Sequence, residues 1–331
     1  MSSSPLLLSF IVPIYNNEDF VIASLSSLYD QIDDQIDDDI EVVIIDDGSS
    51  DASAALVSQF LAARQHPHSK FITQANRGVA HARNVGLQHV SGRYVAFLDG
   101  DDLLSSDYLA ILRPLLLMGK DDLIDFNYQK FSGSPPAVSA NSEVRYRIYD
   151  FEQHGLASLK PLFAHSMWHV WSRIYRRTLL AGETFENGRR YEDVIFTPFQ
   201  YFKTRHIAHL DHSLYLYRDN DRGITRNIRA KDSEDMLFAM QKMLRFVDAH
   251  RGDEPLRQLA ALMLANAFSE LKAMSKAVYG YYHYPPETLA ILRQTAALCS
   301  NSDVPHKKVR QMRFARVDTC LSKLRWWLKK R

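Results

Sequence analysis

The sequence predicts an α/β protein in which a mostly parallel sheet carries helices on both faces and is followed by a helical region. Three observations lead to this fold class. Short apolar runs alternate with segments of helical periodicity up to about Leu104. Several of these runs end in polar or acidic clusters, which is where ligands bind on open parallel sheets. From residue 233 to residue 298 long stretches have helical periodicity.

The expected strands of the first part are apolar and rich in β-branched residues. The first strand, residues 6–14, carries Pro13 near its end, where a missing amide donor disturbs a sheet least. An amphipathic helix is expected at residues 19–29. The next elements, in order, are a strand at 40–45, a helix at 52–63, a strand at 70–74, a helix after the loop 76–78, and a buried strand that begins at Tyr94.

Beyond about Leu104 the pattern is mixed. We expect, in order, a strand at 121–131, an aromatic and basic segment at 168–175, two adjacent carboxylates before an apolar helix at 191–196, an edge strand at 214–218, and helices between 233 and 298 that break near Gly252 and at Pro285-Pro286.

The overall composition is that of an ordinary soluble protein, with 46% hydrophobic and 24% charged residues and a formal net charge of +1. Cys299 and Cys320, the two cysteines, have neither metal-ligand spacing nor a disulfide framework, which suits a reducing compartment. A signal peptide and an apolar run long enough to span a bilayer are both missing from the sequence. These features predict a cytoplasmic protein that meets a membrane, if at all, from its surface.

The most informative stretch is 94–102, where a short apolar run bounded by Gly92 and Gly100 ends in the carboxylates of Asp99, Asp101 and Asp102. Like charges crowded at the end of a strand raise one another's pKa values unless a cation lies among them. The simpler interpretation is an Asp-rich turn that caps the helix expected from about residue 105. Taken alone, the stretch leaves both interpretations open.

Polar clusters follow the first, second and fourth strands, and parallel strands would bring all three to one edge of the sheet. A divalent cation held by Asp101 at this edge suits a diphosphate leaving group. Asp46 is placed to accept hydrogen bonds from a ribose or a base, and Tyr15 to stack on a base. Arg83 either approaches phosphate or forms a structural ion pair.

Two further sites, one acidic and one at a histidine, each have a functional and a structural interpretation. Asp193, beside Glu192 at a helix start, is the candidate base for the nucleophile, although acids there also complement the helix dipole. His212 is a possible metal or phosphate contact, although a histidine on a strand is more often structural.

The segment 307–331 holds ten Lys or Arg against one acidic residue, Asp318, whereas the rest of the chain is net acidic. Its apolar residues recur at helical spacing, and two tryptophans lie near its end: Val317, Leu321, Leu324, Leu328, Trp326 and Trp327. This pattern predicts a basic amphipathic helix on an anionic membrane. The alternatives are a helix packed on the domain and, less favoured, a nucleic-acid patch, for which no reader motif is present.

Taken in order, the motifs resemble those of the family 2 glycosyltransferases of the GT-A fold, the inverting bacterial enzymes that build capsule, exopolysaccharide and lipopolysaccharide. The resemblance covers about residues 6–226. It rests on Val12-Pro13-Ile14-Tyr15-Asn16 with Glu18, Ile45-Asp46-Asp47-Gly48-Ser49-Ser50-Asp51, Asn76-Arg77-Gly78 with Ala82-Arg83-Asn84-Val85-Gly86, Phe97-Leu98-Asp99-Gly100-Asp101-Asp102, the segment 171–177, and Glu192-Asp193 with Phe196.

The resemblance implies a role for each matching position. Asp101 would be the metal ligand of an Asp-X-Asp motif that takes Mn²⁺ or Mg²⁺, and Asp193 the base that deprotonates the acceptor hydroxyl. Trp168 and Glu192 would lie toward the acceptor. The residues implied at the nucleotide-sugar site are Pro13, Tyr15, Glu18, Asp46, Arg83, Asp99 and Gly100.

The resulting expectation is a metal-dependent hexosyltransferase, inverting and peripheral at the inner face of the cytoplasmic membrane. It would move a sugar from a nucleoside-diphosphate donor, with UDP expected, to a saccharide acceptor that is lipid-linked. The expected domains are a catalytic domain at 1–226, a helical region at 227–306 and the basic amphipathic helix at 307–331. Two alternatives stay open: an inactive scaffold on the same fold, and a nucleotidyltransferase that makes sugar nucleotides, against which the chemistry of residues 15–18 argues.

Overall fold

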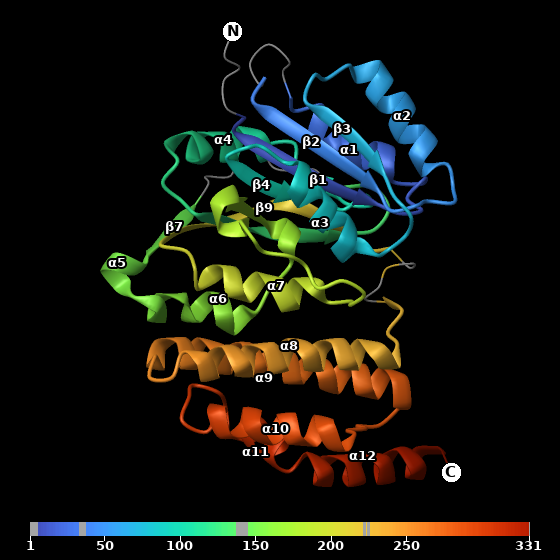
Figure 1. The fold of residues 1–331 in the computed structure, drawn as a ribbon. Coiled ribbons are helices and arrows are strands. Elements are labelled where there is room, and N and C mark those ends of the chain that lie inside the picture. Colours follow the sequence, from blue (N-terminus) through green and yellow to red (C-terminus); the bar gives the residue numbers. More distant parts are fainter. Residues whose placement is uncertain (1–5, 33–37, 137–144, 221–222, 224–225, 331) are drawn as a thin grey trace. The chain divides into compact units, whose positions relative to one another are not determined.

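The computed structural model describes residues 6–32, 38–136, 145–220, 223 and 226–330, and it divides the chain into two compact units. The first unit comprises 1–150, 169–188 and 199–221, and the second comprises 151–168, 189–198 and 222–331. Each unit is built around its own kind of structure, a sheet in the first and helices in the second (Figure 1).

The first unit contains one mixed sheet. Its nine strands, within the described part of the chain, are β1 (Leu8–Ile14), β2 (Ile40–Asp46), β3 (Ser69–Thr73), β4 (Tyr94–Phe97), β5 (Leu103–Leu104), β6 (Leu123–Phe131), β7 (Tyr146–Asp150), β8 (Arg173–Arg176) and β9 (His206–Arg218). Their order across the sheet is β3-β2-β1-β4-β8-β6-β9-β5, and β7 pairs with β9.

The parallel arrangement expected for the first four strands is confirmed. β1 pairs in parallel with β2 and with β4, and β2 pairs in parallel with β3. Beyond β4 the direction changes, because β8 runs antiparallel to both β4 and β6. The edge strand expected at 214–218 proves to be the end of β9, which lies inside the sheet between β6 and β5. Leu214, Tyr215 and Leu216 are buried in succession, so the alternating sequence of this stretch does not mark an exposed face.

Helices cover both faces of this sheet, as the sequence predicts. Successive side chains of a strand point to opposite faces. On β1, Phe10 packs 5.8 Å from the ring of Tyr108, which belongs to α4, whereas Ile11 lies against Gly86 of α3. The four helices of this part are α1 (Val21–Tyr29), α2 (Ser53–Arg64), α3 (Val79–His89) and α4 (Tyr108–Met118).

Glycine at position 86 lets α3 approach the sheet closely. A Cβ atom there would lie 3.1 Å from Ile11 Cγ1 and Ile45 Cδ1, and closer still to Ile11 Cγ2. The helix therefore rests directly on β1 and β2.

The second unit is helical, which confirms the expected change of pattern. Its helices are α5 (Phe151–His154), α6 (Lys160–His165), the start of α7 (Glu192–Tyr201), α8 (Ala230–Ala249), α9 (Glu254–Tyr279), α10 (Pro286–Cys299), α11 (His306–Arg313) and α12 (Ala315–Lys330). The predicted breaks are confirmed, since Gly252 separates α8 from α9 and Pro285-Pro286 begins α10. None of the described helices is long and apolar enough to cross a bilayer.

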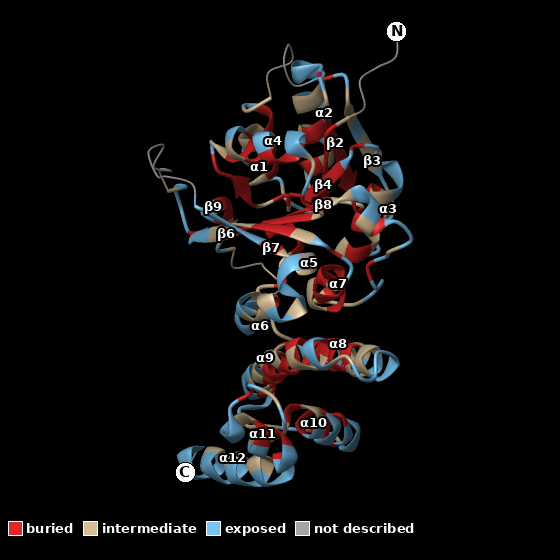
Figure 2. Cartoon of the chain, turned by 90° about the vertical axis from the view of Figure 1, so that its left-hand side faces the viewer, coloured by how far each residue is buried: buried red, intermediate tan, exposed pale blue. Residues whose placement is uncertain are grey.

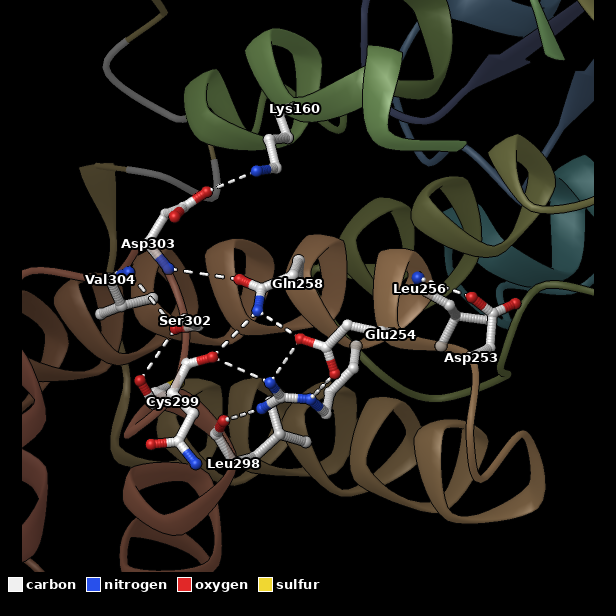
Figure 3. A network of polar contacts seen from close by, with 12 residues as sticks. Lys160, Asp253, Glu254, Leu256, Gln258, Leu298, Cys299, Ser302, Asp303 and Val304 are labelled. Atoms are coloured by element: carbon white, nitrogen blue, oxygen red, sulfur yellow. Dashed lines mark hydrogen bonds and ion pairs between the residues drawn. The ribbon is translucent and has the colours of Figure 1, made fainter. Parts of the chain in front are cut away.

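A polar network fastens the end of α10 to the start of α9 within this unit (Figure 3). Arg257 of α9 donates to the carbonyl oxygens of Leu298 and Asn301, both at 2.8 Å, so it satisfies groups that a helix end leaves open. Gln258 donates to the same Asn301 oxygen at 2.9 Å, and Lys160 reaches Asp303 at 2.7 Å. The network ties the turn after α10 to the start of α9.

Candidate active site

Three loops meet beyond the carboxyl ends of β1, β2 and β3. The loop after β1 is tied to the loop after β2 by two backbone donors, Asn16 N to Ser49 Oγ at 3.0 Å and Asn17 N to Ser53 Oγ at 2.8 Å. Glu18 contributes in the other direction, since its carboxylate accepts from the Ala52 amide at the start of α2 at 2.9 Å. The convergence expected for the polar clusters after the first and second strands is therefore confirmed.

The loop after β3 is held by Asp47, a residue that the sequence analysis did not single out. Its carboxylate accepts from the Arg77 amide at 2.9 Å, the Gly78 amide at 2.7 Å and Gln74 Nε2 at 2.6 Å. The neighbouring Gly48 has φ of +73°, and a Cβ there would lie 2.8 Å from the Asn76 amide. The Asp-Asp-Gly sequence signals this turn, because only glycine fits both the backbone angle and the space.

Asp46, beside it, is buried and accepts from the Ser49 amide at 3.2 Å. Tyr15 lies on the loop after β1 with 48% of its surface exposed, so its ring is accessible for stacking. Pro13 is the penultimate residue of β1, beyond the part of that strand that pairs with β4. All three occupy the edge at which the sequence analysis places a nucleotide.

Asp99 and Arg83 form an ion pair at the same edge. Arg83 Nη2 lies 2.7 Å from Asp99 Oδ1, and the arginine side chain is 3% exposed against 25% for the aspartate. Of the two roles considered for Arg83, the structure contains the ion pair. Gly100 follows, where a Cβ would meet Ile14 Cγ2 at 2.8 Å and Asn17 Oδ1 at 3.0 Å, so a side chain there would push the turn away from β1.

The structure separates Asp102 from the other two carboxylates of this turn. Asp102 is 1% exposed and accepts from Tyr215 Oη at 2.9 Å and from the Arg218 amide at 2.7 Å. Burial, and then the charges of Asp101 and Asp99, raise its pKa well above the usual range. Asp102 therefore anchors the turn to β9.

Asp101 is held by Arg218, the last residue of β9, and by Asn220 just after it. Asn220 Nδ2 donates to Asp101 Oδ2 at 3.0 Å, and Arg218 Nε donates to the Asp101 carbonyl at 2.7 Å. Burial raises the pKa of Asp101; the Asn220 hydrogen bond opposes this, and the charge of Asp99 adds to it. The simpler interpretation, an acidic turn that caps the next helix, does not describe these contacts.

The donor set fits a cation shared with a ligand. Within the described ranges, no three His, Cys, Asp or Glu side chains converge on one point as a complete metal site would require. Mg²⁺ and similar ions are commonly held by one or two carboxylates and completed by substrate phosphates and water. Burial, and the nearby charge of Asp99, raise the pKa of Asp101, so a cation bound there would stabilise its ionised carboxylate.

Arg218 supports this site, and the sequence analysis did not predict that role. Its guanidinium lies between two rings, 4.9 Å from the centroid of Phe20 and 4.6 Å from that of Phe131. From there it supports the backbone of Asp101. An arginine that ends a predicted strand indicates a side chain at the strand's carboxyl end, but not which turn it supports.

His212 is engaged elsewhere on the sheet. Its Nε2 lies 3.1 Å from Asp107 Oδ2, at the start of α4, in a pair of which the histidine is 9% exposed. This is the arrangement of a structural histidine, and a metal or phosphate role for His212 remains a prediction.

Glu192, Asp193 and Trp168 belong to the second unit. Glu192 and Asp193 form the first turn of α7, where Asp193 Oδ1 accepts from the Val194 amide at 2.8 Å. Trp168 is 5% exposed and packs edge-on against Phe163 at 4.9 Å. Their catalytic and acceptor roles remain predictions.

Two buried carboxylates of α8 hold the segment that precedes Asp193. Asp235, 1% exposed, accepts from Arg189 Nη1 at 2.9 Å and from the Arg190 amide at 3.0 Å. Asp232, fully buried, faces Arg190 Nη1 at 3.3 Å. The sequence signal for both lies in the periodicity of α8, because they occupy the same buried face as its apolar residues Met236, Ala239, Met240 and Met243.

The comparisons with known proteins agree with this geometry. The sequence model described as "Glycosyl transferase family 2" matches residues 9–180, which contain β2, β3, β4 and all of β1 but Leu8. The chain belongs to glycosyl transferase family 2. Within this family it is 32% identical over 230 residues to EpsJ of Bacillus subtilis (strain 168), named as an uncharacterised glycosyltransferase, and the match covers 66% of this chain and 63% of EpsJ.

A second relative of the family 2 chain is the glycosyltransferase GlyA of Streptococcus pneumoniae, 28% identical over 244 residues, with 72% of this chain but 34% of GlyA covered. Among solved structures, residues 1–349 of TarS from S. aureus superpose with a TM-score of 0.68 over 94% of this chain and 87% of that one, at 21% identity. TarS has also been solved with UDP-GlcNAc. The likeness confirms the GT-A fold with a helical region after it.

Proposed function

We propose that this family 2 glycosyltransferase inverts the anomeric centre as it moves a hexose from a UDP-sugar to a saccharide acceptor. The single observation that carries the proposal is the turn at β4, where Asp99 pairs with Arg83 and Asp101 remains beside it at the carboxyl edge of the parallel strands. Open α/β sheets bind nucleotides at this edge.

The donor site follows from the loops that meet there. Tyr15 offers a half-exposed ring to a base, and the Asp46 carboxylate lies at the end of β2 where a ribose or base edge would reach it. UDP is the proposed nucleotide because the TarS structures with UDP and UDP-GlcNAc share the fold. The further members of the proposed donor site are Pro13, Glu18, Arg83, Asp99 and Gly100.

Asp101 is the proposed ligand of the Mn²⁺ or Mg²⁺ ion. When bound, such an ion would neutralise the charge that develops on the departing diphosphate. Arg218 and Asn220 hold Asp101 through its carbonyl and its carboxylate, so the ligand is oriented before the donor binds. Preorganisation of this kind is the main contribution that a protein makes to such a site.

Asp193 is the proposed general base. The acceptor hydroxyl would give its proton to the Asp193 carboxylate as its oxygen forms the new bond to the anomeric carbon. The bond from that carbon to the diphosphate oxygen breaks on the opposite side, UDP leaves with the electron pair, and the configuration inverts. Trp168 and Glu192 are the proposed acceptor-side residues.

The proposed acceptor is a lipid-linked saccharide of capsule, exopolysaccharide or lipopolysaccharide synthesis, reached at the inner face of the cytoplasmic membrane. The support is the basic, amphipathic character of residues 307–331. We keep the proposed organisation as a catalytic domain at 1–226, a helical region at 227–306 and this basic segment.

Substitutions at Asp101 and Asp193 test the proposal. In an assay that measures release of UDP from a UDP-sugar with and without acceptor, Asp101→Ala and Asp193→Ala should each lower transfer at least about a hundredfold. Asp248→Ala is the matched control, because Asp248 is an acidic residue with 73% of its side chain exposed. If transfer and donor hydrolysis both survive in the two variants, the proposal is wrong.

Two readouts, the release of UDP and the release of pyrophosphate, separate the alternatives. An inactive scaffold would release no UDP in any variant, including the wild type. A nucleotidyltransferase would release pyrophosphate when given a nucleoside triphosphate and a sugar phosphate.

A further inference from the structure

Helix α12 is fixed to the second unit by one of its faces. Asp318 Oδ2 lies 3.1 Å from Lys272 Nζ of α9, and Ser322 Oγ accepts from the Tyr282 amide at 3.0 Å. Trp326, one helical turn further, lies 5.6 Å from the ring of Tyr281. The spacing of four between these three residues defines a single packed face.

Gly280 makes the contact with Trp326 close. This glycine ends α9 with φ of +79°, and a Cβ there would lie 2.8 Å from Trp326 Cδ1 and closer still to its Nε1. Because the indole lies directly on the backbone, the orientation of α12 about its own axis is set by packing.

A different face of α12 carries an apolar stripe. It consists of Phe314, just before the helix, and Val317, Leu321, Leu324 and Leu328, whose surfaces are 54%, 53%, 47%, 54% and 59% exposed. Their spacings of three, four, three and four place them in one row along the helix. Figure 2 draws most of α12 in the colour of exposed residues.

The concentration of apolar surface here is unusual for the chain. Twelve large hydrophobic residues are exposed in the described part, and six of them, the stripe and Trp327, lie between 314 and 328. A contiguous exposed apolar patch marks an interaction site rather than an ordinary surface.

The charges around the stripe are of one sign. Exposed basic residues lie on both sides of it, with Arg325 on one side and Arg316 and Lys323 on the other at 3.6 residues per turn. Asp318, which is the one acidic residue of the segment 307–331, is on the packed face and is neutralised by Lys272. The exposed surface of α12 is therefore apolar along its middle and positive at its margins.

Trp327 adjoins the stripe on α12, and Tyr279 lies at the end of α9, which contacts the packed face of α12. Tyr279 is 37% exposed, Trp327 is 44% exposed, and Lys323 Nζ lies 5.6 Å from the ring of Tyr281. Tyr and Trp beside Lys and Arg are typical of the level at which a membrane meets water.

We propose that α12 is an in-plane docking helix whose stripe enters the headgroup region of an anionic bilayer while its basic margins contact lipid phosphates. This inference deepens the membrane association in the proposed function and is independent of the catalytic residues. An anionic bilayer is the occupant that fits, because the surface combines apolar area with uniform positive charge. A second copy would bring two strongly basic segments together, which costs binding energy.

Flotation of the full-length chain with vesicles tests the proposal. We expect binding to vesicles of phosphatidylcholine with phosphatidylglycerol, weaker binding at high salt, and little binding to phosphatidylcholine alone. The double variant Leu321→Glu with Leu324→Glu should bind at least about tenfold more weakly. Replacing Lys323 and Arg325 by Gln should weaken binding about fivefold per charge.

Leu117 and Met118, 57% and 56% exposed at the end of α4, supply the matched control. The double variant Leu117→Glu with Met118→Glu introduces the same charges at equally exposed apolar positions and should bind vesicles like the wild type. Thermal unfolding and UDP binding should be unchanged in all variants, which separates failure here from failure of the proposed donor site.

Three results would overturn the proposal. These are no binding of the wild type to anionic vesicles, equal losses in the stripe and control variants, and a concentration-dependent dimer that the Leu321 and Leu324 substitutions abolish. The last result would make the stripe an interface between copies of the chain.

Discussion

Arg218 offers a direct test of how the carboxylate turn is held. Arg218→Met keeps the aliphatic stem but removes the guanidinium that donates to the Asp101 carbonyl at 2.7 Å and lies between Phe20 and Phe131. A hydrogen bond from a charged donor is worth about 1.5–3 kcal/mol. Each of the two cation–π contacts adds about 0.5–1 kcal/mol. The free energy of unfolding should therefore fall by about 2.5–5 kcal/mol.

Urea unfolding at neutral pH measures this change, and UDP affinity in the presence of Mn²⁺ measures its effect on the site. The affinity should fall as well, because the turn that presents Asp101 loses its support. Arg64→Met is the control, since Arg64 also lies over a ring, that of Phe60 at 5.3 Å, but is 39% exposed on α2. Exposed pairs contribute about 0–1 kcal/mol. If Arg218→Met destabilises the protein no more than the control does, the reasoning about this turn is wrong.

Three further predictions follow from other contacts. Glu41→Gln should lower the unfolding free energy by about 2–3 kcal/mol at neutral pH. Burial tends to raise the pKa of Glu41, but hydrogen bonds such as that from Lys70 at 2.6 Å lower it below 4.5. The difference in unfolding free energy between the wild type and the variant should therefore shrink as the pH falls through the folded-state pKa of Glu41. A difference that stays constant with pH would refute this. Gly86→Ala should cost about 1–3 kcal/mol in urea unfolding because its Cβ meets Ile11, and a neutral result would mean that α3 can shift freely. Asp235→Asn should lower kcat for transfer about tenfold while UDP affinity is kept, and an equal loss of both would indicate general unfolding.

The sequence predicts the carboxyl edge of the parallel strands well because its signals are local. Apolar β-branched runs define β1 and β2, and the residues directly after a parallel strand must lie at its carboxyl end. Asp46 and Asp101 could be assigned to one edge for this reason alone.

The contacts that hold this edge together could not be predicted in the same way. Arg218 and Asp101 are separated by 117 positions, and nothing in either local pattern names the other as its partner. Sequence separation also explains why the different contacts of Asp101 and Asp102 could not be predicted. The two look equivalent in the sequence, but Asp102 accepts hydrogen bonds from Tyr215 and from the Arg218 amide.

The second half of the sheet shows a related limit. The alternating sequence at the end of β9 indicates a strand, but pairing partners decide whether a strand is internal. β9 pairs with β6, β5 and β7, and those strands lie far from it in the sequence. For α8, the sequence analysis did not single out Asp232 and Asp235, although both lie on the buried face of the helix with its apolar residues.

We propose that the edge formed by Asp46, Asp99 and Asp101 binds a nucleoside diphosphate together with a divalent cation. The most direct test is a thermal-unfolding panel of UDP, GDP, CDP and TDP, each with Mn²⁺, Mg²⁺ or EDTA. Ligand at about 100 times its Kd stabilises the folded state by about 2.7 kcal/mol. If this edge binds UDP together with a metal ion, UDP should raise the Tm of the wild type. EDTA should abolish this rise, and the Asp101→Ala variant should not show it. An unchanged Tm with every nucleotide and metal would contradict the proposal.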